Sequence, residues 1–133
     1  MIVILDADVL LDIALNRETH ADSSTQVPGH CERRAIRGFV LWHSLSNFYY
    51  IVGSEPEARR FLQELVGFVE VAPTSTEDFR YAARLAVKDL EDAMQVAAAA
   101  ACGADLIVTR NVRDYTRSPI RAISPATLLR ELA

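Results

Sequence analysis

Short apolar runs alternate along this chain with longer stretches in which apolar residues recur at helical spacing. A fully apolar, β-branched run that ends in acidic residues is typical of a strand buried on both faces of a parallel sheet. Residues 2–5 have this character and lead directly into Asp6. Further strands are predicted at residues 39–42, 68–71 and 106–108, with a fifth at residues 120–123. The alternation predicts an α/β fold whose mainly parallel central sheet of four to five strands is flanked by helices.

Helices are predicted between the strands from apolar spacing and from residues that favour helix ends. A polar stretch from residue 17 and a basic segment at residues 32–37, separated by Pro28-Gly29, predict two short helices around a loop. Ser44 is expected to cap a helix that ends at Gly53. The other expected helices begin after Asp6, at residue 55, after a capping box in residues 74–78, at residues 89–92 and at Ser124-Pro125.

The whole chain, residues 1–133, is expected to form a single domain, because its length suits one hydrophobic core. No apolar stretch approaches the roughly 18 to 20 residues that cross a bilayer, and the features of a signal peptide are missing. We therefore expect a cytoplasmic protein without a membrane association. Cys31 and Cys102 are expected to be free thiols. The formal charge of −4 argues against a protein that coats nucleic acid through a positive field.

Three acids, Asp6, Asp8 and Asp12, lie within one predicted strand-to-helix turn. Acids at a helix start can cap backbone N–H groups, and this explanation is as good as a functional one for Asp8 and Asp12. Asp6 differs, because a carboxylate at the end of a buried strand needs a partner that offsets its desolvation. A hard divalent cation with oxygen ligands is such a partner.

A second acidic cluster, residues 89–92, precedes a helix that is otherwise almost uncharged. Helix capping accounts for Asp89. Asp92 is followed at helical spacing by Val96, Ala99 and Ala100, so we expect it on the face that packs inward. A functional carboxylate is favoured there over a buried, hydrogen-bonded acid.

A third group follows the predicted strand at residues 106–108, where Thr109, Arg110, Asn111, Arg113 and Asp114 occur within six positions. Asn111 and Asp114 are equally well explained as turn residues, and the two arginines as solvated surface residues. Ligands of open α/β sheets gather beyond the carboxyl ends of the strands, however, and Asp6 is expected at the same edge.

Three segments together resemble the PIN domain family of small nucleases, and within it the branch of VapC-like toxins of bacterial toxin–antitoxin pairs. They are LDADVLLD at residues 5–12, SLSNFYYIV at residues 44–52 and LEDAMQVAAAAACGADLIVTRNVRDY at residues 90–115. The resemblance extends along nearly the whole chain. It implies a three-layer PIN-like fold, which agrees with the predicted alternation of strands and helices.

The resemblance further implies that Asp6 and Asp92 bind a metal ion, Mg²⁺ or Mn²⁺, and that Asn111 or Asp114 supplies the fourth site position. With Asp6 and Asp92, these two are the expected catalytic residues, and Asp114 is a third expected metal ligand. Thr109 lies beside them. The expected reaction is metal-dependent hydrolysis of RNA, in which the metal activates water and offsets charge at the scissile phosphate.

Two cations, Arg110 and Arg113, are expected to bind the substrate phosphate together with the neighbouring Thr109. The resemblance also implies two protein partners, a cognate antitoxin and a second copy of the chain in a homodimer. Trp42, Tyr49 and Tyr50 are candidates for an interface, although aromatics at helical spacing more often pack in the core.

The sequence departs from the family at the second acid, where Asn47 stands in place of a glutamate. Asn47 also lies three residues after Ser44, so a capping-box role is equally consistent. Loss of one carboxylate is expected to weaken metal binding. Asp8, which replaces a frequent asparagine of the family, and Glu91 are hypothesised to compensate.

Two alternatives remain at the level of sequence. The strand followed by Asp6-Ala7-Asp8 also resembles the start of haloacid-dehalogenase-type phosphatases, but Leu10 stands where that motif has a polar residue. A PIN fold with an incomplete acidic set is also compatible with a module that binds RNA or protein without cutting, and Asn47 is the feature that favours it.

Overall fold

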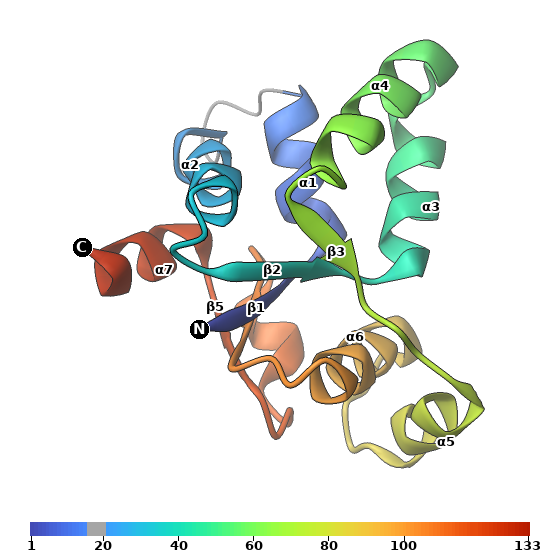
Figure 1. Ribbon diagram of the computed structural model, residues 1–133. Helices are drawn as coiled ribbons and strands as arrows, with labels where there is room; N and C mark the ends of the chain where they lie inside the picture. Colours follow the sequence, from blue (N-terminus) through green and yellow to red (C-terminus); the bar gives the residue numbers. More distant parts are fainter. Residues whose placement is uncertain (16–20) are drawn as a thin grey trace.

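The computed structural model describes residues 1–15 and 21–133, which form a three-layer α/β structure (Figure 1). The strands are β1 (Ile2–Leu5), β2 (Arg37–Val40), β3 (Val69–Val71), β4 (Leu106–Val108) and β5 (Arg121–Ile123). The helices are α1 (Ala7–Leu15), α2 (Ala21–Glu32), α3 (Trp42–Val52), α4 (Glu55–Leu65), α5 (Thr76–Arg84), α6 (Leu90–Ala101), the 3₁₀ helix η1 (Val112–Tyr115) and α7 (Pro125–Leu132). In the described part of the chain, no helix is long and apolar enough to cross a membrane.

The five strands form one parallel sheet in the order β3-β2-β1-β4-β5. The central strand β1 pairs with β2 on one side and with β4 on the other, so that Ile4 lies between Phe39 and Ile107. The predicted α/β class and mainly parallel sheet are confirmed, with all five strands parallel.

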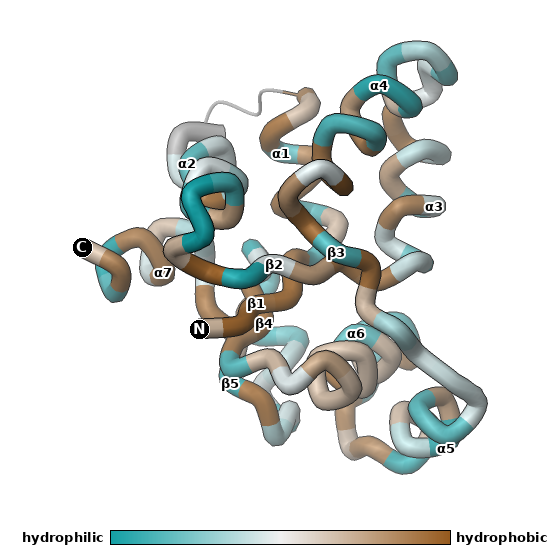
Figure 2. Tube along the Cα trace, viewed as in Figure 1, coloured by the Kyte–Doolittle hydropathy of each residue, from teal (hydrophilic) through white to brown (hydrophobic). Residues whose placement is uncertain are grey.

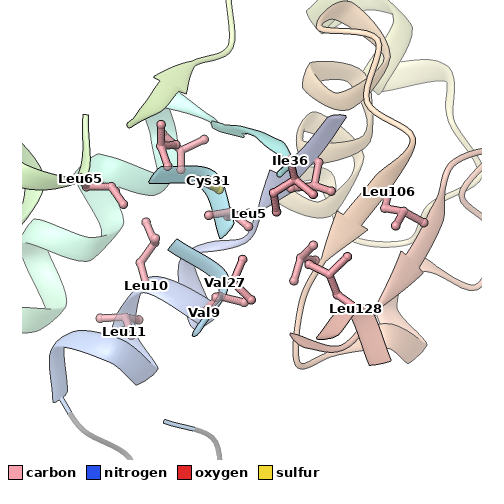
Figure 3. Packing of buried hydrophobic residues seen from close by; sticks show 14 of the residues in the cluster. Leu5, Val9, Leu10, Leu11, Val27, Cys31, Ile36, Leu65, Leu106 and Leu128 are labelled. Atoms are coloured by element: carbon pink, nitrogen blue, oxygen red, sulfur yellow. The ribbon is translucent and has the colours of Figure 1, made fainter. Parts of the chain in front are cut away.

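Alternate strand residues point into two separate cores. Val3 and Leu5 pack with residues of α1, α2, α3, α4 and α7, whereas Ile4 packs with α5, α6 and Tyr115 (Figure 1). Figure 2 shows the apolar strands at the centre and polar residues along the outer helices. Figure 3 shows the first core, where Leu5 lies among side chains from α1 and α2. Burial on both faces explains why β1 is apolar at every position.

The segment predicted as two short helices is one helix in its described part, α2, which continues through Pro28. Residues 17–20 of that prediction lie outside the described residues. Proline inside a helix removes one backbone hydrogen bond and costs about 3 kcal/mol. Val27 and Cys31, on either side of Pro28, are buried in the first core, and this burial offsets the cost.

The second strand begins two residues earlier than predicted and α3 starts at Trp42, so Ser44 is not its cap. Ser44 is instead a buried residue of the first turn, where its N–H donates to the Leu41 carbonyl. Leu41 packs in the second core and is the residue before the first turn of α3, and the next residue, Trp42, is 71% exposed. The predicted helix end at Gly53 is confirmed by its left-handed backbone, with a φ of 73°.

The other predicted helix starts are confirmed. Ser75 and Asp78 form the predicted capping box of α5, and Ser124 caps α7 with Pro125 in its first turn. Asp89 caps α6 by accepting from the Asp92 N–H. Along α6 the expected inward face is only partly right, because Ala100 is exposed.

Candidate functional site

Asp6 leaves the carboxyl end of β1 at the point where the neighbouring strand β4 also ends. Its N–H donates to the Val108 carbonyl at 2.9 Å, which ties the two strand ends together. The carboxylate is a partly buried acceptor, with Oδ1 2.7 Å from the Ala7 N–H and Oδ2 3.0 Å from the hydroxyls of both Thr109 and Tyr115. Burial raises the pKa of Asp6 above its ordinary value, an effect that these hydrogen bonds oppose and that the charge of Asp114 reinforces.

Asp92 reaches the same place from the first turn of α6. The Tyr115 hydroxyl, which contacts Asp6, also lies 3.3 Å from Asp92 Oδ1. Burial raises the pKa of Asp92 to about 6, and the charges of Asp89, Asp6 and Asp114 add to the effect. The fold therefore brings together the two acids on which the sequence interpretation depended.

Asp8 lies in the first turn of α1 and contacts the segment that follows β4. Its Oδ2 accepts from the Thr109 hydroxyl at 3.1 Å, the Arg110 N–H at 3.1 Å and the Asn111 side-chain amide at 2.9 Å. Burial raises the pKa of Asp8 to about 6, and the nearby charge of Asp6 contributes. Its Oδ1 is buried without a hydrogen-bond partner.

Thr109 is fully buried, and its single hydroxyl lies within hydrogen-bond distance of both Asp6 and Asp8. Its oxygen also accepts from the Asn111 N–H at 3.0 Å. Thr109 therefore orients the carboxylates of Asp6 and Asp8, and the Asn111 side chain contacts Asp8.

The exposed residues of η1 complete this edge. Asp114 lies close enough for its charge to raise the pKa of both Asp6 and Asp92. Together with Arg113 and Asp92, it lines a cavity of about 720 Å³ beside the acids.

Arg110 points away from that cavity. Its Nε lies 3.1 Å from Asp12 Oδ2, and Asp12 is fully buried in the structure. Asp12 is therefore the buried partner in an ion pair rather than a helix-capping residue, and Arg110 anchors the segment after β4 to α1.

Asn47 does not form a capping box with Ser44, so that expectation was wrong. Its Nδ2 lies 3.2 Å from His43 Nε2, which in turn lies 2.9 Å from Glu91 Oε1. This chain of side chains connects α3 to the start of α6, one residue before Asp92.

Two important residues were given no role by sequence reasoning. Tyr115 was part of the TRNVRDY motif, but only the fold shows that its buried hydroxyl contacts two acids. Gln95 is buried and donates to the Leu5 carbonyl at 3.3 Å, which fixes α6 against the end of β1. Its polarity within an otherwise apolar helix was the available signal.

The donor set fits a hard divalent cation with few protein ligands. Asp6, Asp8 and Asp92 share two hydroxyl protons, and in the described part of the chain no lysine or arginine is ion-paired with any of them. Burial is the main cause of the raised pKa values of all three acids, and Asp8 Oδ1 is buried without a hydrogen-bond partner, so a bound cation would offset their desolvation. Within residues 1–15 and 21–133 no three acidic, His or Cys side chains form a ready metal site. Mg²⁺ tolerates this, because it retains several waters and often takes only one or two carboxylates.

Comparison with known proteins identifies the family of the chain. The PIN domain family model matches residues 2–113. Among curated proteins, no sequence matches the chain.

Three solved structures have a similar fold over nearly their full chains. The first is VapBC2 from Rickettsia felis bound to a promoter DNA fragment. Its TM-score is 0.73 at 17% identity, and the match covers 93% of this chain and 98% of that chain. VapBC-1 from nontypeable Haemophilus influenzae gives 0.69 at 14% identity, covering 95% and 99%. FitAcB from Neisseria gonorrhoeae gives 0.67 at 11% identity, covering 93% and 98%.

At these identities the structural matches show a shared fold, and the family model carries the assignment. The resemblance to the PIN domain family is confirmed by the family model, and the fold is one that the VapBC structures share. Because the family match extends over most of the sequence and the folds agree, this chain belongs to the PIN domain family.

Proposed function

We propose that this protein is a metal-dependent endoribonuclease, a hydrolase of RNA phosphodiester bonds, and the toxin of a toxin–antitoxin pair. The observation that carries the proposal is the convergence of Asp6 and Asp92 on one Tyr115 hydroxyl at the carboxyl edge of the sheet. Among the described residues neither carboxylate has an ion-pair partner, and Asp92 lines an open cavity.

In this proposal Asp6 and Asp92 hold Mg²⁺ or Mn²⁺, and Asp114 or Asn111 completes the shell directly or through water. When bound, the metal supplies an activated water and positive charge at the scissile phosphate. Thr109 and Tyr115 keep the carboxylates oriented, and Arg113 contacts the phosphate from the cavity wall. Arg110 contributes less to phosphate binding than the sequence predicted, because its guanidinium pairs with Asp12.

The decisive experiment compares wild type with Asp6→Asn on a labelled RNA, with Mg²⁺, with Mn²⁺ and with EDTA. We expect cleavage by the wild type only with metal, and a loss of at least about a hundredfold in Asp6→Asn. Circular dichroism should show the same fold in both proteins. Cleavage by Asp6→Asn at the wild-type rate would remove the site assignment.

A non-catalytic RNA- or protein-binding module is the second candidate, favoured by Asn47 in place of the family glutamate. RNA binding and cleavage measured in parallel separate the two, since tight binding without metal-dependent products supports the module. The family assignment argues against the phosphatase alternative.

The proposed partners are RNA, a small antitoxin and a second copy of the chain. Support for the antitoxin is the fold shared with VapBC2, VapBC-1 and FitAcB. For the homodimer, Trp42, Tyr49 and Tyr50 are all exposed on α3 and so do not pack in the core. Sedimentation velocity should show a dimer that Tyr50→Ser weakens, and an unaffected dimer would exclude this surface as the interface.

A further inference from the structure

The cavity beside Asp92 is enclosed by two segments that each contribute positive charge. Lys88 comes from the connection between α5 and α6, and Arg113 and Arg117 come from η1 and the residues after it. Asp92 and Asp114 lie in the same lining, so the cavity of about 720 Å³ opens directly onto the proposed metal site.

None of these three cations forms an ion pair with a described residue, although Asp89, Asp92 and Asp114 line the same cavity. Elsewhere arginines do pair, as Arg37 does with Glu70 at 2.8 Å. Cations that served only to neutralise the local acids would be expected to contact them. Instead they remain available to a polyanion.

The negative charge of the protein makes these cations important for binding a nucleic acid strand. The protein carries a formal charge of −4 and its proposed catalytic edge is acidic, so a nucleic acid strand is repelled unless cations lie along its path. Contacts between Lys or Arg and phosphates supply sequence-independent affinity through counterion release. Lys88 is the only lysine of the chain, and it occurs in this lining.

We infer that this cavity is the binding subsite for the sugar–phosphate backbone of the RNA next to the cleaved bond, with Lys88 and Arg117 as phosphate contacts beside Arg113. The inference rests on the proposed function and extends it, since neither Lys88 nor Arg117 belongs to the acidic centre. Recognition by charge at this subsite is independent of base sequence.

The test is fluorescence anisotropy of a labelled single-stranded oligoribonucleotide with the full chain in EDTA, so that binding is measured without cleavage. We expect the Lys88→Gln/Arg117→Gln protein to bind about tenfold more weakly than wild type at low salt. The slope of log affinity against log salt should fall by about 1.4, since each phosphate contact with a single strand contributes about 0.7.

Arg60→Gln is the matched control for each single variant at Lys88 or Arg117, because Arg60 is exposed on α4, outside the cavity lining, and the change likewise removes one positive charge. Its affinity should stay within about twofold of wild type. The two single variants at Lys88 and Arg117 guard against misfolding of the double variant, and each should show about half of the loss in slope.

Unchanged binding by the double variant, or an equal loss in Arg60→Gln, would overturn the inference. So would a glutamate-rich peptide that displaces the labelled strand more readily than an unlabelled oligoribonucleotide of equal charge, since the subsite would then suit an acidic protein segment. Binding that depends on Lys88 and Arg117 without any metal-dependent cleavage would support the inference and count against the nuclease. Metal-dependent cleavage with unaltered binding in the double variant would reject the inference alone.

Discussion

Arg110 and Asp12 form an ion pair that joins the segment after β4 to the middle of α1, with Nε 3.1 Å from Oδ2. Asp12 is fully buried, whereas the side chain of Arg110 is 26% exposed. Removal of Arg110 therefore leaves a fully buried carboxylate, whereas removal of Asp12 leaves a guanidinium that is partly exposed to water. The segment they anchor carries Thr109 and Asn111, which contact Asp6 and Asp8.

Removal of the arginine should cost more stability than removal of the acid. Arg110→Met removes a cationic partner from a fully buried carboxylate, and we expect a loss of about 3 kcal/mol in the free energy of unfolding. Asp12→Asn leaves a guanidinium that still reaches water, so its loss should be smaller. Urea unfolding of both variants measures the difference, and equal midpoints for all three proteins would show that the pair contributes nothing.

Loss of the Tyr115 hydroxyl should lower the stability of the protein, because Asp6 and Asp92 would then repel each other without a shared hydrogen-bond donor. Tyr115→Phe keeps the buried ring but removes the donor that both carboxylates share. We expect about 1–2 kcal/mol less stability in EDTA at neutral pH. Phe79→Leu, at an exposed position on α5, is a suitable control. A Tyr115→Phe protein as stable as wild type would mean that the hydroxyl is dispensable.

Protonation of Asp8 should stabilise the metal-free protein. Burial, reinforced by the charge of Asp6, raises its pKa from 3.8 to about 6, so the folded state binds this proton more tightly than the unfolded chain. The contribution is fully present below about pH 4 and is lost as pH rises through about 6, and it amounts to roughly 3 kcal/mol. Asp6 and Asp92 act in the same direction.

The measurement is urea unfolding in EDTA between pH 4 and pH 7 for wild type and Asp8→Asn. Wild type should lose stability relative to the variant across this range, because asparagine does not titrate. A constant gap between the two proteins would contradict the assignment.

Compensation for Asn47 should come from Asp8 rather than from Glu91. Asp8 interacts electrostatically with Asp6 and has a free buried oxygen, whereas Glu91 is exposed and contacts His43. Calorimetric titration with Mn²⁺ is expected to show about tenfold weaker binding for Asp8→Asn and a change within about twofold for Glu91→Gln. Unchanged affinity in both variants would remove the compensation hypothesis.

The sequence alone was sufficient for the elements whose signals are local. Burial on both faces demands apolar residues throughout β1 and β4, and backbone geometry at helix ends selects Ser75, Ser124 and Gly53. Parallel strands also have a common carboxyl edge, so the meeting of Asp6 with the residues after Val108 followed from the predicted topology. Asp92 was expected there through the family resemblance.

The partners of the polar side chains depend on the three-dimensional packing of the helices around the sheet. Asp12 and Arg110, like Tyr115 and the two acids that it contacts, are distant in sequence, and their pairing depends on how α1, α6 and η1 pack around the sheet. The predicted helix break at Pro28 and the predicted cap at Ser44 were wrong for the same reason. Local propensities of about 1–3 kcal/mol are outweighed there by burial of neighbouring side chains. Periodicity records which residues are buried, but the contacts between buried polar groups are determined by the complete fold.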